Sequence, residues 1–81
     1  MKRNWDTVRR ILLAIENEAH HVRHGDFLRT LGGDREVRRH FDLLMQAGFI
    51  SSFSEIDMGL IISGLTMSGH DLLDQIRDKN P

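Results

Sequence analysis

The chain has 81 residues, 40% of them hydrophobic and 28% charged, which favours one small folded domain spanning residues 1–81 over a disordered chain. The sequence contains no cysteine, which excludes disulfides, thiolate metal sites and a cysteine nucleophile. Its net charge of −1 argues against strong indiscriminate binding to nucleic acid, and no apolar run approaches the roughly 20 residues that cross a bilayer, so we expect a cytoplasmic protein.

The first predicted element is a helix over residues 5–19. Asn4 precedes it as an N-cap, because its side-chain oxygen can accept a free amide of the first turn. Apolar residues at helical spacing form its expected buried stripe: Trp5, Val8, Ile11, Leu12 and Ile15.

Two further helices follow, separated by a glycine turn. Asp26 is expected to cap a short helix over residues 27–31, and Gly32-Gly33 is the clearest turn in the chain. Asp34 then caps a third helix over residues 35–47. Its expected buried residues are Val37, Phe41, Leu44 and Met45, and Gly48 ends it.

The periodicity then changes from helical to strand-like. Residues 49–53 and 60–65 are predicted strands, joined as a hairpin by the loop at residues 54–59. Thr66 caps a last helix over residues 67–78, which turns Leu72, Leu73 and Ile76 inward. The prediction is a mainly α fold with a small β-hairpin (α+β), in the order α-α-α-β-β-α of a winged helix-turn-helix.

Several segments resemble a known family. They are residues 1–6 (MKRNWD), 10–13 (RILL), 40–50 (HFDLLMQAGFI) and 65–78 (LTMSGHDLLDQIRD). Together they resemble a bacterial and phage family of hypothetical proteins, domain of unknown function 2513, and Gly69-His70-Asp71 is the most specific part. Met67 and Leu72 stand where an aromatic residue and Phe are expected. The resemblance implies a winged-helix architecture and transfers no functional site, because the family has no established activity.

The third helix occupies the recognition position of a helix-turn-helix, which suggests a DNA-binding transcriptional regulator of bacterial or phage origin. Arginine can bond guanine edges and glutamine adenine edges. Residues 1–40 carry a net charge of +3 and residues 41–81 a net of −4, so any contact with a polyanion should come from the first half. The DNA-binding candidates are Arg35, Arg38, Arg39 and Gln46, helped by Lys2, Arg3 and Arg10. The partner is then double-stranded DNA, bound by a possible homodimer.

Two observations keep other interpretations open. Arg38 and Asp42 lie four residues apart and could simply pair on a solvated helix face. The hairpin loop carries carboxylates and apolar side chains where a DNA-contacting wing usually carries cations. The alternative is therefore a protein–protein interaction module, or a phage-encoded inhibitor of a host complex, that uses Glu55, Ile56, Asp57, Met58, Asp71 and Asp74.

No catalytic or metal site is expected. His20, His21 and His24 are most simply exposed residues near a helix end, since zinc needs three or four convergent ligands. His70 is expected to be a partly buried lock between the last helix and the hairpin, with Gly69 allowing close approach. No nucleophile elbow, phosphate loop or paired-carboxylate cleft is visible, so we expect neither enzyme activity nor a cofactor.

Overall fold

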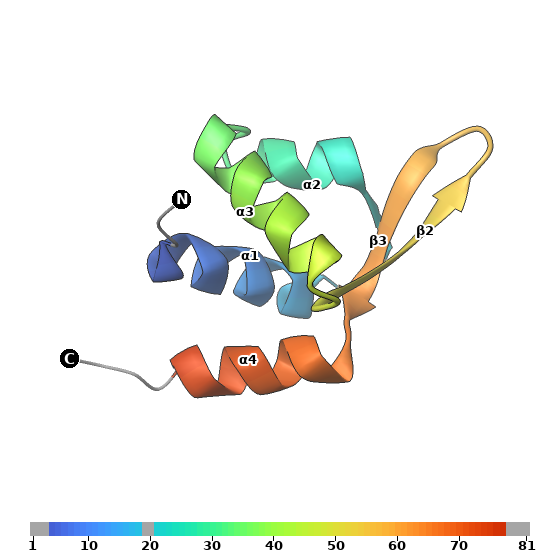
Figure 1. Ribbon diagram of the computed structural model, residues 1–81. Coiled ribbons are helices and arrows are strands. Elements are labelled where there is room, and N and C mark those ends of the chain that lie inside the picture. The colour runs from blue at the N-terminus through green and yellow to red at the C-terminus, as the bar shows by residue number, and fades with distance from the viewer. Residues whose placement is uncertain (1–3, 19–20, 78–81) are drawn as a thin grey trace.

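The computed structural model describes residues 4–18 and 21–77. Its elements (Figure 1) are α1 (Trp5–Asn17), β1 (Val22–Arg23), α2 (His24–Thr30), α3 (Arg35–Gln46), β2 (Ile50–Glu55), β3 (Gly59–Leu65) and α4 (Met67–Arg77). The predicted mixed α+β class and the order of helices and hairpin are confirmed, with one additional short strand.

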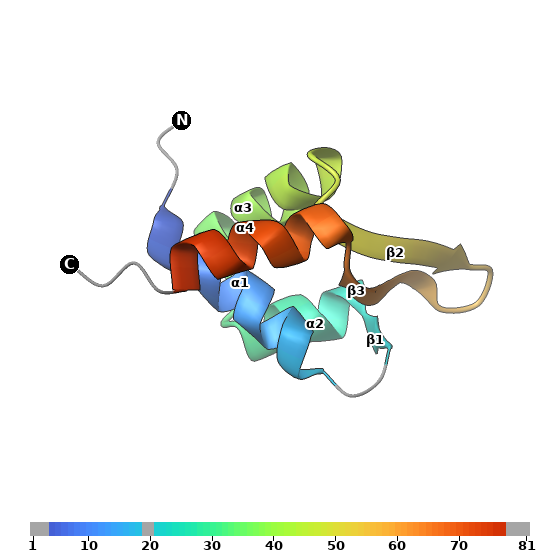
Figure 2. The same ribbon diagram turned by 90° about the horizontal axis from the view of Figure 1, so that it is seen from below.

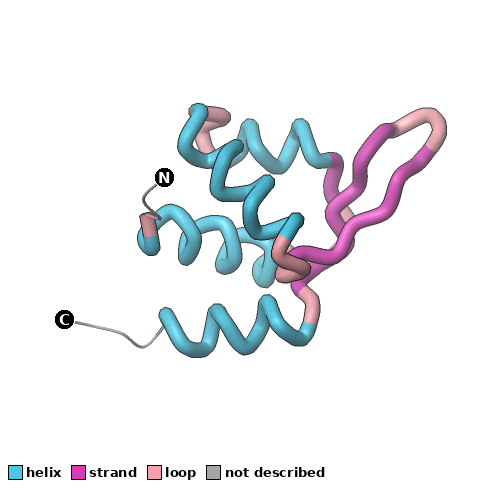
Figure 3. The backbone as a smooth tube through the Cα atoms, viewed as in Figure 1, coloured by secondary structure: helices cyan, strands magenta, loops and turns pink. Residues whose placement is uncertain are grey.

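The sheet has three antiparallel strands in the order β1-β3-β2. The hairpin of β2 and β3 projects beyond the helices (Figure 3), and its ladder contains an irregularity between Ser51 and Ser52. β1 adds a third strand by pairing Val22 with Ile62 of β3. Sequence periodicity missed it because two residues carry no detectable alternation.

The predicted start of the second helix is wrong. α2 begins at His24 rather than at residue 27, and its N-cap is Arg23, whose side chain makes no capping bond. Asp26 therefore lies inside the helix, where its carboxylate is 3.4 Å from Arg29. β1 ends directly before α2, so the start of this helix follows the pairing of β1 with β3 and not a capping side chain. The predicted ends at residues 19 and 78 lie outside the described residues.

The core is built from the predicted stripes, with one correction. Val8, Ile11, Leu12 and Ile15 of α1 are buried, but Trp5 is 46% exposed. Trp5 stands in the first turn of α1, at the open edge of the packing between α1, α3 and α4. The buried hydrophobic residues of the other elements are Phe27, Leu28, Val37, Phe41, Leu44, Ile50, Ile61, Ile62, Leu73 and Ile76. Met45 and Leu72 are only partly buried.

Asn4 caps α1 with its side-chain oxygen and bonds to α3 through its side-chain and backbone nitrogens. Its side-chain Oδ1 accepts from the amides of Asp6 and Thr7 at 3.0 and 3.2 Å, which confirms the predicted cap. Its Nδ2 donates to Glu36 at 2.9 Å. Its backbone N–H donates to Nε2 of His40, so the Nδ1 of this buried histidine carries the proton and donates to the Glu36 carbonyl at 2.8 Å. The start of α1 is thereby fixed against the middle of α3.

Replacing Asn4 by alanine should lower the free energy of unfolding by about 1–2 kcal/mol, because the cap and the bond to Glu36 are both lost. Asn4→Ser keeps an oxygen that can cap, so it should recover most of this loss. Urea unfolding of the two variants measures the difference. Equal stability of Asn4→Ala and the wild type would contradict the assigned cap.

α4 packs across α1 on the side away from α2 (Figures 1 and 2). Its start is held by Thr66, whose hydroxyl donates to the Gly48 carbonyl at 2.6 Å and accepts from the Gly69 amide at 3.0 Å. This confirms the predicted cap. Its end is held by Arg77, which donates to both carboxylate oxygens of Glu16 at 2.6 and 2.7 Å. Within the described residues, no helix is long and apolar enough to cross a membrane.

Candidate nucleic-acid interface

The α3 helix is oriented by its buried side. Val37, Phe41 and Leu44 are 2%, 0% and 6% exposed, and they define the face that packs on the core. Successive helix residues turn by about 100°, so the opposite face is fixed by the same geometry. That outward face carries Arg35, Arg39, Asp42 and Gln46, all of which are exposed.

The N-terminus of α3 is well defined because Asp34 caps it. The Asp34 Oδ1 accepts from the Val37 amide at 2.8 Å, as the sequence predicts. The turn before it uses Gly32 and Gly33 at φ 98° and 65°, a region that favours glycine. Arg35 therefore projects from the first turn of a helix whose starting point is set by both a cap and a turn.

Arg38 occupies the edge of this face. It lines a shallow cleft of about 380 Å³ between α2 and α3, together with His24, Arg29 and Asp42. In the part of the chain that the structure describes, Arg38 and Asp42 do not form the ion pair that their spacing allows. Arg38 is exposed, so its charge adds to that of the outward face.

Of the remaining cationic candidates, the structure describes Arg10, which lies on α1 and is not part of the α3 face. The Nη2 of Arg10 donates to the Leu31 carbonyl at 3.2 Å, which ties α1 to the turn between α2 and α3. Lys2 and Arg3 lie outside the described residues. The structure thus brings together four of the seven predicted DNA-binding residues, namely Arg35, Arg38, Arg39 and Gln46, on one helix.

The residues of the alternative interpretation lie at two separate places. Glu55, Ile56, Asp57 and Met58 form the tip of the hairpin, which we call the wing tip, and all four are exposed. Asp71 and Asp74 are exposed on α4, on the other side of α1 from α2 and far from the hairpin end (Figure 1). Two surfaces rather than one acidic surface are therefore available.

The histidines that the structure describes do not converge on a metal site. The His21 ring contacts Phe53 at 5.3 Å between centroids, and the His24 ring contacts Phe41 at 5.0 Å. Across residues 4–18 and 21–77, no group of three or more His, Asp or Glu side chains could hold a metal ion. His20 lies outside those residues.

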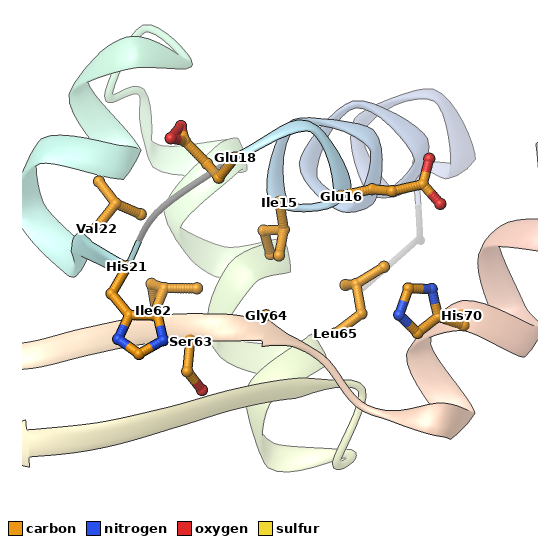
Figure 4. Close-up of a pocket in the computed structure, with 10 residues that line it drawn as sticks. All are labelled: Ile15, Glu16, Glu18, His21, Val22, Ile62, Ser63, Gly64, Leu65 and His70. Atoms are coloured by element: carbon orange, nitrogen blue, oxygen red, sulfur yellow. The ribbon is translucent and has the colours of Figure 1, made fainter.

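One open pocket of about 370 Å³ lies between the end of α1, β3 and the start of α4. Figure 4 shows His21 and His70 at opposite ends of this pocket, with Gly64 between them. Glu16, which also lines it, is engaged by Arg77. The lining groups are therefore dispersed along the pocket rather than gathered around one point.

The expected role of His70 as a partly buried lock is wrong, because His70 is exposed. Gly69 fills that role together with Thr66. Gly69 is buried, and a Cβ built on it would lie 2.1 Å from the Phe49 carbonyl oxygen. The close approach predicted for Gly69 is confirmed, and the neighbouring imidazole of His70 lies exposed at one end of the open pocket.

Sequence reasoning missed a narrow apolar groove beside the arginine face. It lies between α1, α3 and α4 and has a volume of about 60 Å³. Its side chains include Trp5 at 46% and Leu43 at 38% exposure. Leu43 was the available signal, because it is the one large apolar residue of α3 that falls outside the predicted buried stripe.

Comparison with known proteins gives a family and a relative. The sequence profile of the family described as "Hypothetical protein (DUF2513)" matches residues 2–81. The chain is similar to an uncharacterized protein of Haemophilus influenzae, with 44% identity over 84 residues that cover 96% of this chain and 70% of that protein. No solved structure matches the chain.

Proposed function

This chain belongs to the family of hypothetical proteins described as DUF2513, and we propose that it binds double-stranded DNA through the outward face of α3. In this proposal the protein is a small transcriptional regulator of bacterial or phage origin without catalytic activity. The observation that carries it is the placement of Arg35, Arg39 and Gln46 opposite the buried face of a capped helix. These side chains can donate to guanine and adenine edges in a major groove.

The charge distribution supports contact through α3 and not through the wing tip. α3 carries three arginines against Glu36 and Asp42, whereas the wing tip carries Glu55 and Asp57 and no cation. Phosphates near the wing tip would be repelled, since like charges at short range are unfavourable. A DNA complex of this protein would therefore rest on α3, without the phosphate contacts that a basic wing supplies.

Changing Arg35 and Arg39 together to alanine should weaken duplex binding about 30-fold or more, since the two arginine contacts, at about 1–3 kcal/mol each, total at least about 2 kcal/mol. Both side chains are exposed, so the fold should remain intact. Fluorescence anisotropy with a labelled duplex of random sequence at about 50 mM salt measures the affinity. Circular dichroism checks the fold.

The matched control removes the same charge from elsewhere. Arg23 on β1 and Arg29 on α2 are exposed, and changing both to alanine should weaken binding by less than about threefold. If both double variants lose the same affinity, binding reflects total charge and α3 is not the contact. Full affinity in the Arg35/Arg39 variant contradicts the proposal more directly.

The wing tip supports the second candidate, a protein–protein interaction module or a phage-encoded inhibitor of a host complex. Ile56 is fully exposed between Glu55 and Asp57, and Met58 beside Asp57 is 47% exposed. The two carboxylates would also suit a basic partner surface. Reversing the charges of Glu55, Asp57, Asp71 and Asp74 should then abolish capture of a host protein. Capture that survives this change would count against the candidate.

A further inference from the structure

His40 of α3 is 3% exposed, and it is the one buried titratable side chain among the residues that the structure describes. It faces the start of α1, and the apolar side chains near it come from three helices and include Val8, Leu44 and Leu72. A charge in such surroundings is costly unless a hydrogen-bond partner matches it. The protonation state of His40 therefore bears on how α1 and α3 fit together.

Both ring nitrogens of His40 are engaged, and each partner can play only one part in its hydrogen bond. Nδ1 donates to the Glu36 carbonyl at 2.8 Å, and a carbonyl oxygen can only accept. Nε2 accepts from the backbone N–H of Asn4 at 2.9 Å, and that N–H can only donate. These two partners fit the neutral imidazole with its proton on Nδ1. A second proton, on Nε2, would point at the Asn4 N–H, so protonation removes this bond.

Carboxylates border this region on each of the three helices: Glu36 on α3, Asp6 on α1 and Asp71 on α4, all of them exposed. Asp6 is 3.6 Å from Arg9 of its own helix, and Glu36 accepts from the Asn4 Nδ2 at 2.9 Å. A protonated ring can donate to a carboxylate only after it turns away from the Asn4 amide. If it takes Glu36, which lies one helical turn before it, Asn4 loses its second contact with α3 as well.

From this geometry we propose that His40 and Asn4 form a proton-sensitive latch between α3 and α1. The neutral imidazole holds the Asn4 amide and closes the latch, and protonation opens it and releases the first turn of α1. Imidazoles titrate between about pH 5 and pH 8, and the closed latch requires the neutral ring. The latch is therefore closed at neutral pH, and the stability that it provides is lost as the pH falls through this range. The inference does not depend on DNA binding by α3.

Nuclear magnetic resonance of the wild-type protein tests the latch directly. At about pH 8 the ring nitrogens of His40 should show the tautomer with the proton on Nδ1. As the pH is lowered until the ring is protonated, the protection of the Asn4 amide against hydrogen exchange should fall about 3- to 10-fold, the usual worth of one hydrogen bond. The Phe41 amide in the core should keep its protection. A proton on Nε2 at pH 8 overturns the proposal, as does unchanged protection of Asn4 or a simultaneous loss at Asn4 and Phe41.

A pair of variants assigns the effect to His40, with the emission of Trp5, the single tryptophan, as the reporter. His40→Gln offers an oxygen that can accept from the Asn4 amide but does not titrate, so the acid-induced change in emission should be absent. His70→Gln removes an exposed imidazole from α4 and is the matched control, which should keep the change. A change that persists in His40→Gln, or that is lost equally in His70→Gln, overturns the proposal. If His40→Gln does not fold, the tautomer and exchange measurements on the wild type decide alone.

Discussion

Gly69→Ala should destabilise the protein by about 3 kcal/mol, at the upper end of the usual cost of overpacking. The added Cβ would lie 2.1 Å from the Phe49 carbonyl oxygen, and that oxygen belongs to a backbone already held by the Thr66 amide at 3.1 Å. Neither partner can yield without shifting the start of α4 away from β2. In a domain of this size, the melting temperature should fall by roughly 12–24 °C.

Gly25→Ala is the matched control for this prediction. Gly25 is also helical, but a Cβ built on it meets nothing within 4 Å. Its replacement should therefore leave stability unchanged or raise it by up to about 1 kcal/mol through backbone entropy. If thermal unfolding finds the two variants equally stable, the close approach of α4 to Phe49 is not as described.

Phe41→Ala should lower the free energy of unfolding by about 3–5 kcal/mol. The Phe41 ring is fully buried and lies 5.7 Å from the Phe27 ring and 5.0 Å from the His24 ring. These contacts join α3 to α2. A domain of 81 residues has a total stability of only about 4–12 kcal/mol, so this single cavity removes much of it.

Leu43→Ala provides the comparison within the same helix. Leu43 is 38% exposed and lies on the groove side of α3, so its truncation should change the free energy of unfolding by only about 0.5 kcal/mol. Urea denaturation of both variants measures the contrast. Similar losses from Phe41→Ala and Leu43→Ala would mean that α3 does not bury the face assigned to it.

Local sequence patterns were sufficient to predict the features that depend on one helix and its flanking residues. The caps at Asn4, Asp34 and Thr66 and the C-terminal Gly48, at φ 82°, follow from short-range chemistry and were predicted. The start of α2 and the strand β1 were not, because both depend on the pairing of Val22 with Ile62, forty residues along the chain. A strand of two residues is too short to show the alternation of apolar and polar residues that would predict such a pairing.

The candidate interface could be predicted only in part, for a similar reason. The helical period of α3 is enough to place Arg35, Arg39 and Gln46 opposite Val37 and Phe41. The helical period does not predict which other elements pack beside α3, and so does not predict how much of each side of the helix stays exposed.

The apolar groove between α1, α3 and α4 arises from side chains on three helices and the segment before β2. The exposed position of His70 follows from the close contact of Gly69 with Phe49. Both features are properties of tertiary packing. The spacing of apolar residues within one segment was therefore not enough to predict either feature.

The most direct test of DNA binding by α3 is the salt dependence of duplex affinity for the wild-type protein. On a duplex of random sequence the α3 arginines would meet phosphates instead of specific base edges, and neutralisation of three phosphates predicts a slope of about −2.7 in log K against log salt, or a loss of about 40-fold between 50 and 200 mM. The Arg35/Arg39 double variant should then retain a slope near −0.9. No detectable binding at 50 mM, or a wild-type slope that the double variant fails to reduce, would contradict the proposed interface.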